Sequence, residues 1–217
     1  MLKRHRINHR HHPPVAKYPG TTRIEAFSDG IMAIIITIMV LELRVPKLAA
    51  SFTRDEFWAE AIHFWPKLLV YAMSFVIVGI FWVNHHGFFH SLQKSDGKLL
   101  WYNNLMMFWM SLIPFGTAFL GEHPTSPEAA MIFGGIMTMA AFSFPLMGHY
   151  AMFKSDLMHE SITPEMKQAN LRRSLPGGVL YLVSVLVAPF SVWVSWGIFF
   201  IVPLYYFMPR VFGEENS

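Results

Sequence analysis

Long apolar stretches separated by short polar segments dominate the chain after its first 29 residues. They occupy 30–41, 68–83, 99–121, 129–153 and 175–209. A helix of about 20 apolar residues crosses the hydrocarbon core of a bilayer, which is about 30 Å thick. The last stretch would reach about 52 Å as one straight helix. The available helix breakers are Pro189, Ser191, Ser195 and Gly197, so we expect it to turn back near 192–197. The pattern predicts an all-α integral membrane protein with six membrane-spanning helices.

The expected organisation is a six-span unit over residues 21–210 between two short tails. The spans are expected at about 22–45, 57–91, 98–121, 127–153, 173–192 and 195–210. Residues 1–20 form a basic, histidine-rich tail, and residues 211–217 form a short C-terminal tail. Attraction of the first tail to anionic headgroups is favoured over metal binding, because a metal site needs convergent ligands on an ordered scaffold.

Composition agrees with a surface that faces lipid. Hydrophobic residues make up 53% of the chain and charged residues only 14%, against about 25% charged in a typical soluble domain. The mean hydropathy is +0.37. These values exclude a disordered chain, and the absence of cysteine excludes disulfides, thiolate metal sites and a cysteine nucleophile. A net charge of +3 could suggest nucleic acid, but in a membrane protein the placement of the positive charges matters more than their sum, so we expect no nucleic-acid partner.

Lysine and arginine are distributed unevenly over the expected loops. If the N-terminus lies inside, the inner segments hold Lys3, Arg4, Arg6, Arg10, Lys17, Arg23, Lys94, Lys98, Lys154, Lys167, Arg172, Arg173 and Arg210. The outer segments hold Arg44, Lys47, Arg54 and Lys67. Cytoplasmic loops carry an excess of positive charge. We therefore expect a multi-pass protein of the plasma membrane with both termini in the cytoplasm.

The first span contains an ionisable residue inside its apolar helix. The segment from Thr22 to Glu25 fits a capping box, so the helix is expected to begin near residue 22. Asp29 then lies more than one turn inside the helix. An ionisable residue at membrane depth is costly unless it is paired or hydrated, which makes Asp29 a candidate functional residue.

A polar cluster is expected where the first two spans meet. The second span runs back, so Trp82 and His85 should arrive at the depth of Arg23, Ser28 and Asp29. The cluster is either part of a gate or ion path, or a buried hydrogen-bond network that fixes helix packing; the second interpretation is favoured. At 100° per residue, Asp29 points about 140° away from Ile34 on a helical wheel. If Ile34 faces a central axis, Asp29 therefore faces neighbouring helices.

One motif resembles a known family. The run Arg23-x-x-x-Phe27-Ser28-Asp29, the isoleucine-rich helix after it and Trp82-x-x-His85 are similar to the transmembrane protein 175 family of potassium channels. The similarity covers about residues 20–210. It implies a potassium-preferring cation channel, with K⁺ as the permeant ion, no cofactor and no enzymatic activity. The single six-span unit resembles the prokaryotic form, which implies a homotetramer around a pore lined by the first helix.

The resemblance also implies positions for the pore. Carried over by position, the hydrophobic constriction falls on Ile34, further apolar layers fall on Ile38 and Leu41, and the Thr37 hydroxyl contributes to potassium preference. K⁺ would then pass close to Ile34 and Thr37. No TVGYG-like filter is present, and a ring of isoleucines can gate a pore by dewetting. Without the resemblance, these positions would be interpreted as lipid-facing or core residues.

Two other functions compete with a channel. A secondary ion transporter is typically built from paired broken helices in two repeated halves, and the two halves here share no obvious pattern. A multi-histidine membrane metalloenzyme is suggested by His85, His86, His90 and His149. It would need many ligands converging on one site, so we expect it less.

Overall fold

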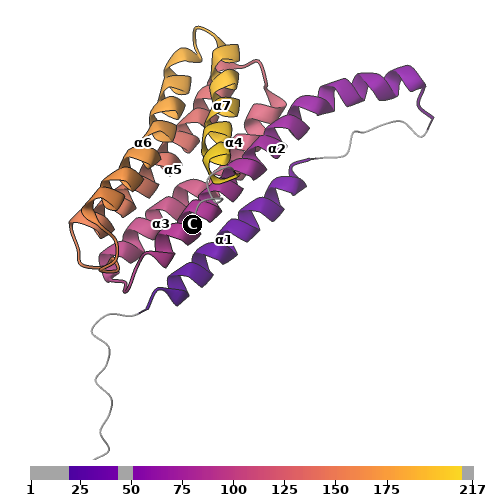
Figure 1. Ribbon diagram of the computed structural model, residues 1–217. Helices are drawn as coiled ribbons and strands as arrows, with labels where there is room; N and C mark the ends of the chain where they lie inside the picture. The colour runs from indigo at the N-terminus through magenta and orange to yellow at the C-terminus, as the bar shows by residue number, and fades with distance from the viewer. Residues whose placement is uncertain (1–19, 44–50, 212–217) are drawn as a thin grey trace, which may run out of the picture.

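The structure, a computed structural model, describes residues 20–43 and 51–211, with side chains described as far as Phe207. Its helices are α1 (Thr22–Leu41), α2 (Arg54–His90), α3 (Gly97–Ser111), α4 (Ile113–Glu122), α5 (Pro127–Phe153), α6 (Pro164–Val187) and α7 (Val192–Val211). They pack side by side as a bundle, from which the first part of α2 projects (Figure 1). Within the described ranges every regular element is a helix, so the expected all-α fold is confirmed.

Four segments are long and apolar enough to cross a membrane: α1, α2, α3 together with α4, and α5. The α3–α4 segment is divided at Leu112. Pro114 follows two residues later, and its ring nitrogen cannot donate to the carbonyl one turn earlier. The end expected for the first span, at residue 45, lies outside the described residues.

The helix starts differ in how they are capped. The expected box between Thr22 and Glu25 is wrong: Thr21 is the N-cap and makes no side-chain capping hydrogen bond. Its backbone is helical, with φ −80° and ψ −22°, whereas a capping side chain needs an extended backbone to reach the free amides. A true capping box starts α2, between Thr53 and Glu56. Hydrogen bonds from the Thr53 amide and hydroxyl hold the pKa of Glu56 below its ordinary value.

The turn between the last two helices comes earlier than expected. Residues 188–191 connect α6 to α7, so the expectation of a turn at 192–197 is wrong. Pro189 lies in this connection and cannot continue the helical hydrogen-bond ladder. Ser195, which was expected to break the helix, is fully buried inside α7 and donates to the Ser184 carbonyl at 2.7 Å. Its hydroxyl therefore joins the two helices.

The two ends of the bundle are held by different contacts. At one end, the Gln93 amide donates to the Leu157 carbonyl at 2.8 Å and Lys94 pairs with Asp156 at 2.7 Å. The start of α1 lies there too, because Ser95 donates to the Gly20 carbonyl at 3.3 Å. We call this the basic end; its cations are Arg23, Lys94, Lys98, Lys154, Lys167, Arg172 and Arg173.

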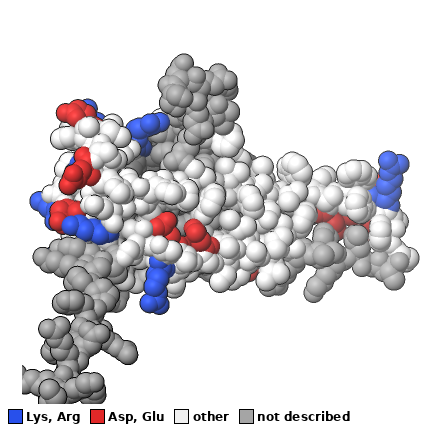
Figure 2. All heavy atoms as spheres, turned by 60° about the horizontal axis from the view of Figure 1, so that its bottom comes forward, with Lys and Arg blue, Asp and Glu red and all other residues white. Residues whose placement is uncertain are grey.

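At the opposite end, Lys67 of α2 pairs with Glu122 of α4 at 2.6 Å. The indole of Trp196 there donates to the Pro124 carbonyl at 2.9 Å. On the face in Figure 2, most charged side chains lie toward the two ends of the molecule, some acidic ones reach inward from one end, and the surface between is largely uncharged. A bilayer-spanning bundle requires such a surface, because lipid cannot solvate charge.

Close packing of α5 on α6 depends on one of two adjacent glycines. A Cβ added at Gly134 would lie 2.7 Å from Ser184 Oγ and 3.0 Å from Val185 Cγ2, whereas one added at Gly135 meets nothing within 4 Å. We expect Gly134→Ala to lower the free energy of unfolding by about 1–3 kcal/mol through overpacking. Gly135→Ala should raise it slightly, since alanine is the better helix former. Thermal unfolding of both purified variants in one detergent checks this, and equal shifts would contradict it.

Candidate functional site

The first helix presents two different faces. Its buried positions recur with helical spacing: Ile24, Ser28, Met32, Ile35 and Met39. The opposite face is uncovered within the described part of the chain. Side-chain exposure there is 57% at Ile34, 42% at Ile38 and 73% at Leu41. Thr37 is exposed on the same side. We call Ile34, Thr37, Ile38 and Leu41 the outer stripe.

A buried polar triad fixes the inner face of α1. Ser28 of α1, His85 of α2 and Asn103 of α3 are each at most 1% exposed. Asn103 Oδ1 accepts from the Ser28 hydroxyl at 3.2 Å and contacts His85 Nε2 at 2.9 Å, and Asn103 Nδ2 donates back to Ser28 Oγ at 2.9 Å. Because Oδ1 can only accept, Nε2 of His85 carries the proton. The His85 ring also stacks on Phe89, with centroids 4.3 Å apart.

The triad determines which way the outer stripe faces. Ser28 and Ile34 are separated by about 120° around the helix at 100° per residue. If Ser28 turned away from Asn103, buried hydrogen-bonding groups on three helices would lose partners, each at a cost of about 1–3 kcal/mol. No buried side-chain nitrogen or oxygen among the described residues lacks a partner. The rotation of α1 about its own axis is thus fixed by buried polar contacts.

Asp29 belongs to a separate contact. Its Oδ1 accepts a hydrogen bond from Trp82 Nε1 at 3.0 Å. The Trp82 ring in turn stacks on His86, with centroids 5.8 Å apart and planes 19° apart. Asp29 therefore contacts α2, while its own side chain remains exposed.

The remaining motif residues lie outside both groups. Arg23 and Phe27 are exposed on α1, and the two ion pairs found among the described residues do not involve Arg23. The motif and its partners thus divide into the buried triad, the Asp29–Trp82 pair and two exposed side chains.

The Thr37 hydroxyl has a defined orientation. It lies 3.0 Å from the Ala33 carbonyl and 2.9 Å from the Ile34 carbonyl, to which it donates. Its single proton is therefore directed back at its own helix. The oxygen lone pairs remain available on the exposed side, where they can accept a hydrogen bond or approach a cation.

Asn103 was missed by the sequence analysis. It lies in the stretch 99–121, which was predicted only to be a membrane span because it carries no charge. The available signal was the pair of amides at 103 and 104 in an apolar helix, since polar side chains at membrane depth hydrogen-bond to other helices. Only Asn103 is buried; Asn104 is exposed.

The histidines do not gather into one site. His85 belongs to the triad, His86 and His90 contact each other with Nε2 atoms 3.1 Å apart, and His149 lies against the Phe153 ring. In residues 20–43 and 51–211, no three His, Cys, Asp or Glu side chains converge to hold a metal. This arrangement gives no support to a multi-histidine metalloenzyme.

The sequence is similar to one family of potassium channels and to individual members of it. The sequence model of the endosomal/lysosomal potassium channel TMEM175 family matches residues 23–114. A potassium channel of a Chryseobacterium species is 31% identical over 190 residues, which cover 86% of this chain and 92% of the relative. A potassium channel of Chamaesiphon minutus is 33% identical over 189 residues, covering 86% and 93%.

The fold is also similar to that of a solved TMEM175 structure. The crystal structure of a lysosomal potassium-selective channel TMEM175 homolog from Chamaesiphon minutus superposes with a TM-score of 0.74 at 31% identity. The match covers 86% of this chain and 95% of that one. These relatives are channels rather than enzymes. The chain is a multi-pass membrane protein, not an enzyme, and it belongs to the TMEM175 family.

Proposed function

We propose that the chain forms a potassium-preferring cation channel in which the outer stripe of α1 lines a central pore. One observation carries the proposal: in a relative of named potassium channels, the apolar face with Ile34, Ile38 and Leu41 is turned outward by a buried polar triad. A pore-lining helix needs a fixed rotation, because the same face must meet the axis in every copy.

The outer stripe suits a constriction that works without carbonyl ligands. Side chains at Ile34, Ile38 and Leu41 repeat every three or four residues and span about 10 Å along the helix. A ring of them would offer no ligand, so an ion would pass partly dehydrated, or wait until the ring widens and wets. Potassium gives up hydration water more readily than sodium, so such a ring favours potassium modestly. Outward lone pairs of Thr37 would add a weak polar contact within the apolar passage.

A pore built from one helix of each chain needs several copies. We propose a homotetramer, with the outer stripes of four α1 helices meeting on the axis. The large exposed aromatic and aliphatic side chains on the other helices would face lipid or the neighbouring subunits. Conduction would be passive, down the electrochemical gradient, with K⁺ as the permeant ion and no cofactor.

The charge distribution supports an orientation in the membrane. We propose six crossings, with α3 and α4 forming one of them and α6 and α7 forming the last two. Seven described Lys and Arg side chains lie at the basic end, so the positive-inside rule places that end in the cytoplasm. Both termini would then lie on the cytoplasmic side of the plasma membrane.

Recording from purified protein in a planar bilayer tests the proposed function. With KCl on one side and NaCl on the other, we expect stepwise single-channel currents whose reversal potential is displaced toward the equilibrium potential of potassium. Protein-free bilayers from the same preparation serve as the control. Saturating, strictly coupled exchange without current steps would instead identify a secondary transporter.

A further inference from the structure

A cavity of about 660 Å³ lies between α2, α5, α6 and α7, on the side of α2 away from the triad. Its size is within the range of pockets that hold small organic ligands, about 300–1,000 Å³. The helix α2 contributes lining residues from Ile77 to Ser91, so the cavity runs along the bundle for roughly 20 Å. It is separate from the outer stripe, which it does not include.

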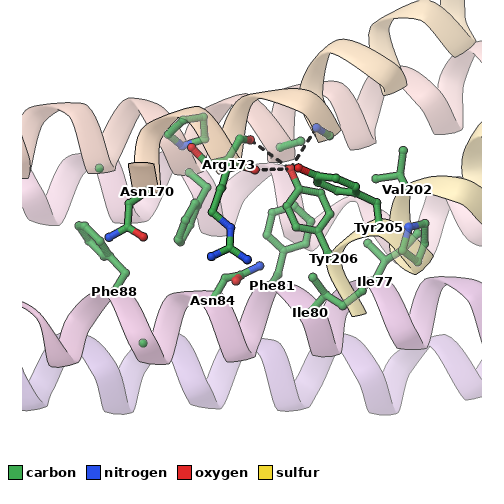
Figure 3. Close-up of a pocket in the computed structure, with 18 of the residues that line it drawn as sticks. Ile77, Ile80, Phe81, Asn84, Phe88, Asn170, Arg173, Val202, Tyr205 and Tyr206 are labelled. Atoms are coloured by element: carbon green, nitrogen blue, oxygen red, sulfur yellow. Dashed lines mark hydrogen bonds between the residues drawn. The ribbon is translucent and has the colours of Figure 1, made fainter. Parts of the chain in front are cut away.

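The two ends of the cavity differ in polarity. Toward the basic end its polar lining residues are Asn84, Ser91, Asn170, Arg173 and Ser174, which stand beside the apolar Phe88, Met152 and Met158. Toward the middle of the bundle the lining is mostly apolar, with Ile77, Ile80, Phe81, Phe144 and Val202. Figure 3 shows the same order, with Asn170 and Phe88 at one side, Arg173 and Asn84 in the centre, and Ile77, Ile80 and Val202 at the other side.

Arg173 brings a positive charge into this cavity. Its side chain extends from α6 toward α2, and the guanidinium points at Asn84 (Figure 3). The two ion pairs among the described residues join other side chains, so no described carboxylate neutralises Arg173. Two other acids at the basic end have partners of their own: Asp156 pairs with Lys94, and Asp96 accepts from the Tyr150 hydroxyl. The charge is therefore available to an anion.

The backbone next to Arg173 is held in place. The Tyr206 hydroxyl of α7 accepts from the Gly177 amide at 3.0 Å and lies 3.1 Å from the Arg173 carbonyl, to which it donates. These contacts fasten α7 to α6 beside the cavity. A Cβ at Gly177 would lie only 2.8 Å from the Tyr206 ring, which shows how closely this wall is packed.

We propose that this cavity binds an anionic glycerophospholipid, with its phosphate on Arg173 and one acyl chain in the apolar part. A guanidinium binds phosphate oxygens through paired charge-assisted hydrogen bonds. Basic pockets between membrane helices bind anionic lipid headgroups in this way. The apolar part gives the acyl chain a surface that a soluble anion would leave empty, so the occupant is a lipid rather than free phosphate. The inference goes beyond ion conduction and does not depend on it.

Native mass spectrometry of the purified protein, titrated with phosphatidylglycerol or phosphatidylcholine, tests the proposal. We expect Arg173→Ala to weaken phosphatidylglycerol binding by about five-fold or more, because one cation near a headgroup contributes about 1 kcal/mol. Phosphatidylcholine, whose choline offsets the phosphate charge, should bind the wild type more weakly and lose less on this substitution. Arg172→Ala is the matched control, since Arg172 is the next residue on α6, is exposed and does not line the cavity. Equal effects of the two substitutions would overturn the assignment.

A second variant tests whether an acyl chain occupies the apolar part of the cavity. Ile80→Trp should fill the apolar part and weaken binding of phosphatidylglycerol while the helix content and assembly size stay those of the wild type. Unchanged lipid binding in a folded Ile80→Trp protein would show that the chain lies elsewhere. Inorganic phosphate, added as a competitor at millimolar concentration, should not displace the lipid. Full displacement would identify a soluble-anion site and contradict the proposal.

Discussion

Replacing Ile34 with Asn is expected to bring the permeability ratio of potassium to sodium close to unity. Four amides around the axis would hydrate the constriction, so that ions no longer need to shed water there. The discrimination that rests on the cost of dehydration would then disappear, and conductance should rise. Reversal potentials of purified wild-type and variant channels under bi-ionic K⁺/Na⁺ conditions measure this effect directly.

Val40→Asn provides the matched control for Ile34→Asn. Val40 is also an exposed aliphatic residue of α1, at 46% against 57% for Ile34. It points about 120° away from Ile34 around the helix, so its amide would not enter the proposed pore. Selectivity should remain that of the wild type. If the Ile34 variant kept its selectivity as well, Ile34 would have to be removed from the conduction path.

Replacing Asn103 with Ala should have the largest effect on stability of the substitutions considered. It removes the only amide that joins Ser28 to His85 among the described contacts, and it leaves two groups buried without their partner. Each such group costs about 1–3 kcal/mol. We expect a lower unfolding temperature and a smaller fraction of assembled protein, measured by thermal unfolding and by size-exclusion chromatography.

Substitution of the neighbouring Asn104 tests whether the loss of stability is specific to Asn103 or follows from any substitution in α3. Asn104→Ala alters an exposed side chain one residue away, and surface substitutions usually change stability by less than about 0.5 kcal/mol. A comparable loss in both variants would show that the triad is not what holds α1. Wild-type stability of Asn103→Ala would contradict the role given to the triad.

Much of the helical layout was readable from the sequence because long apolar runs have few alternatives. The fourth expected span, 127–153, coincides with α5. Its start is marked by Ser126, whose hydroxyl accepts from the Ala129 amide at 3.1 Å, and by Pro127 at the first helical position. The turn at 188–191 was harder to place, because Pro189, Ser191, Ser195 and Gly197 all qualified as helix breakers, and Ser195 is instead a buried hydrogen-bond donor inside α7. Whether Ser195 breaks a helix or donates a hydrogen bond depends on its contact with α6, and the residues around Ser195 do not reveal that contact.

The candidate site was only partly predictable, and for a physical reason. Residues 31–41 are apolar apart from Thr37, so hydrophobicity alone cannot tell the buried side of α1 from the exposed side. The contact partner Asn103 is 75 positions away from Ser28. Residues so far apart meet only through tertiary packing. The motif indicated candidate residues, whereas the structure shows which of them share a hydrogen-bond network.

The most direct test of the proposed pore uses the absence of cysteine from the chain. Leu41→Cys would place a single thiol at the most exposed position of the outer stripe, 73% exposed, and Val40→Cys would place one beside it on a different side of α1. A positively charged, membrane-impermeant methanethiosulfonate reagent should block the potassium current of Leu41→Cys and leave that of Val40→Cys unchanged. Block of Val40→Cys together with an unaffected Leu41→Cys current would contradict the claim that the outer stripe lines the pore.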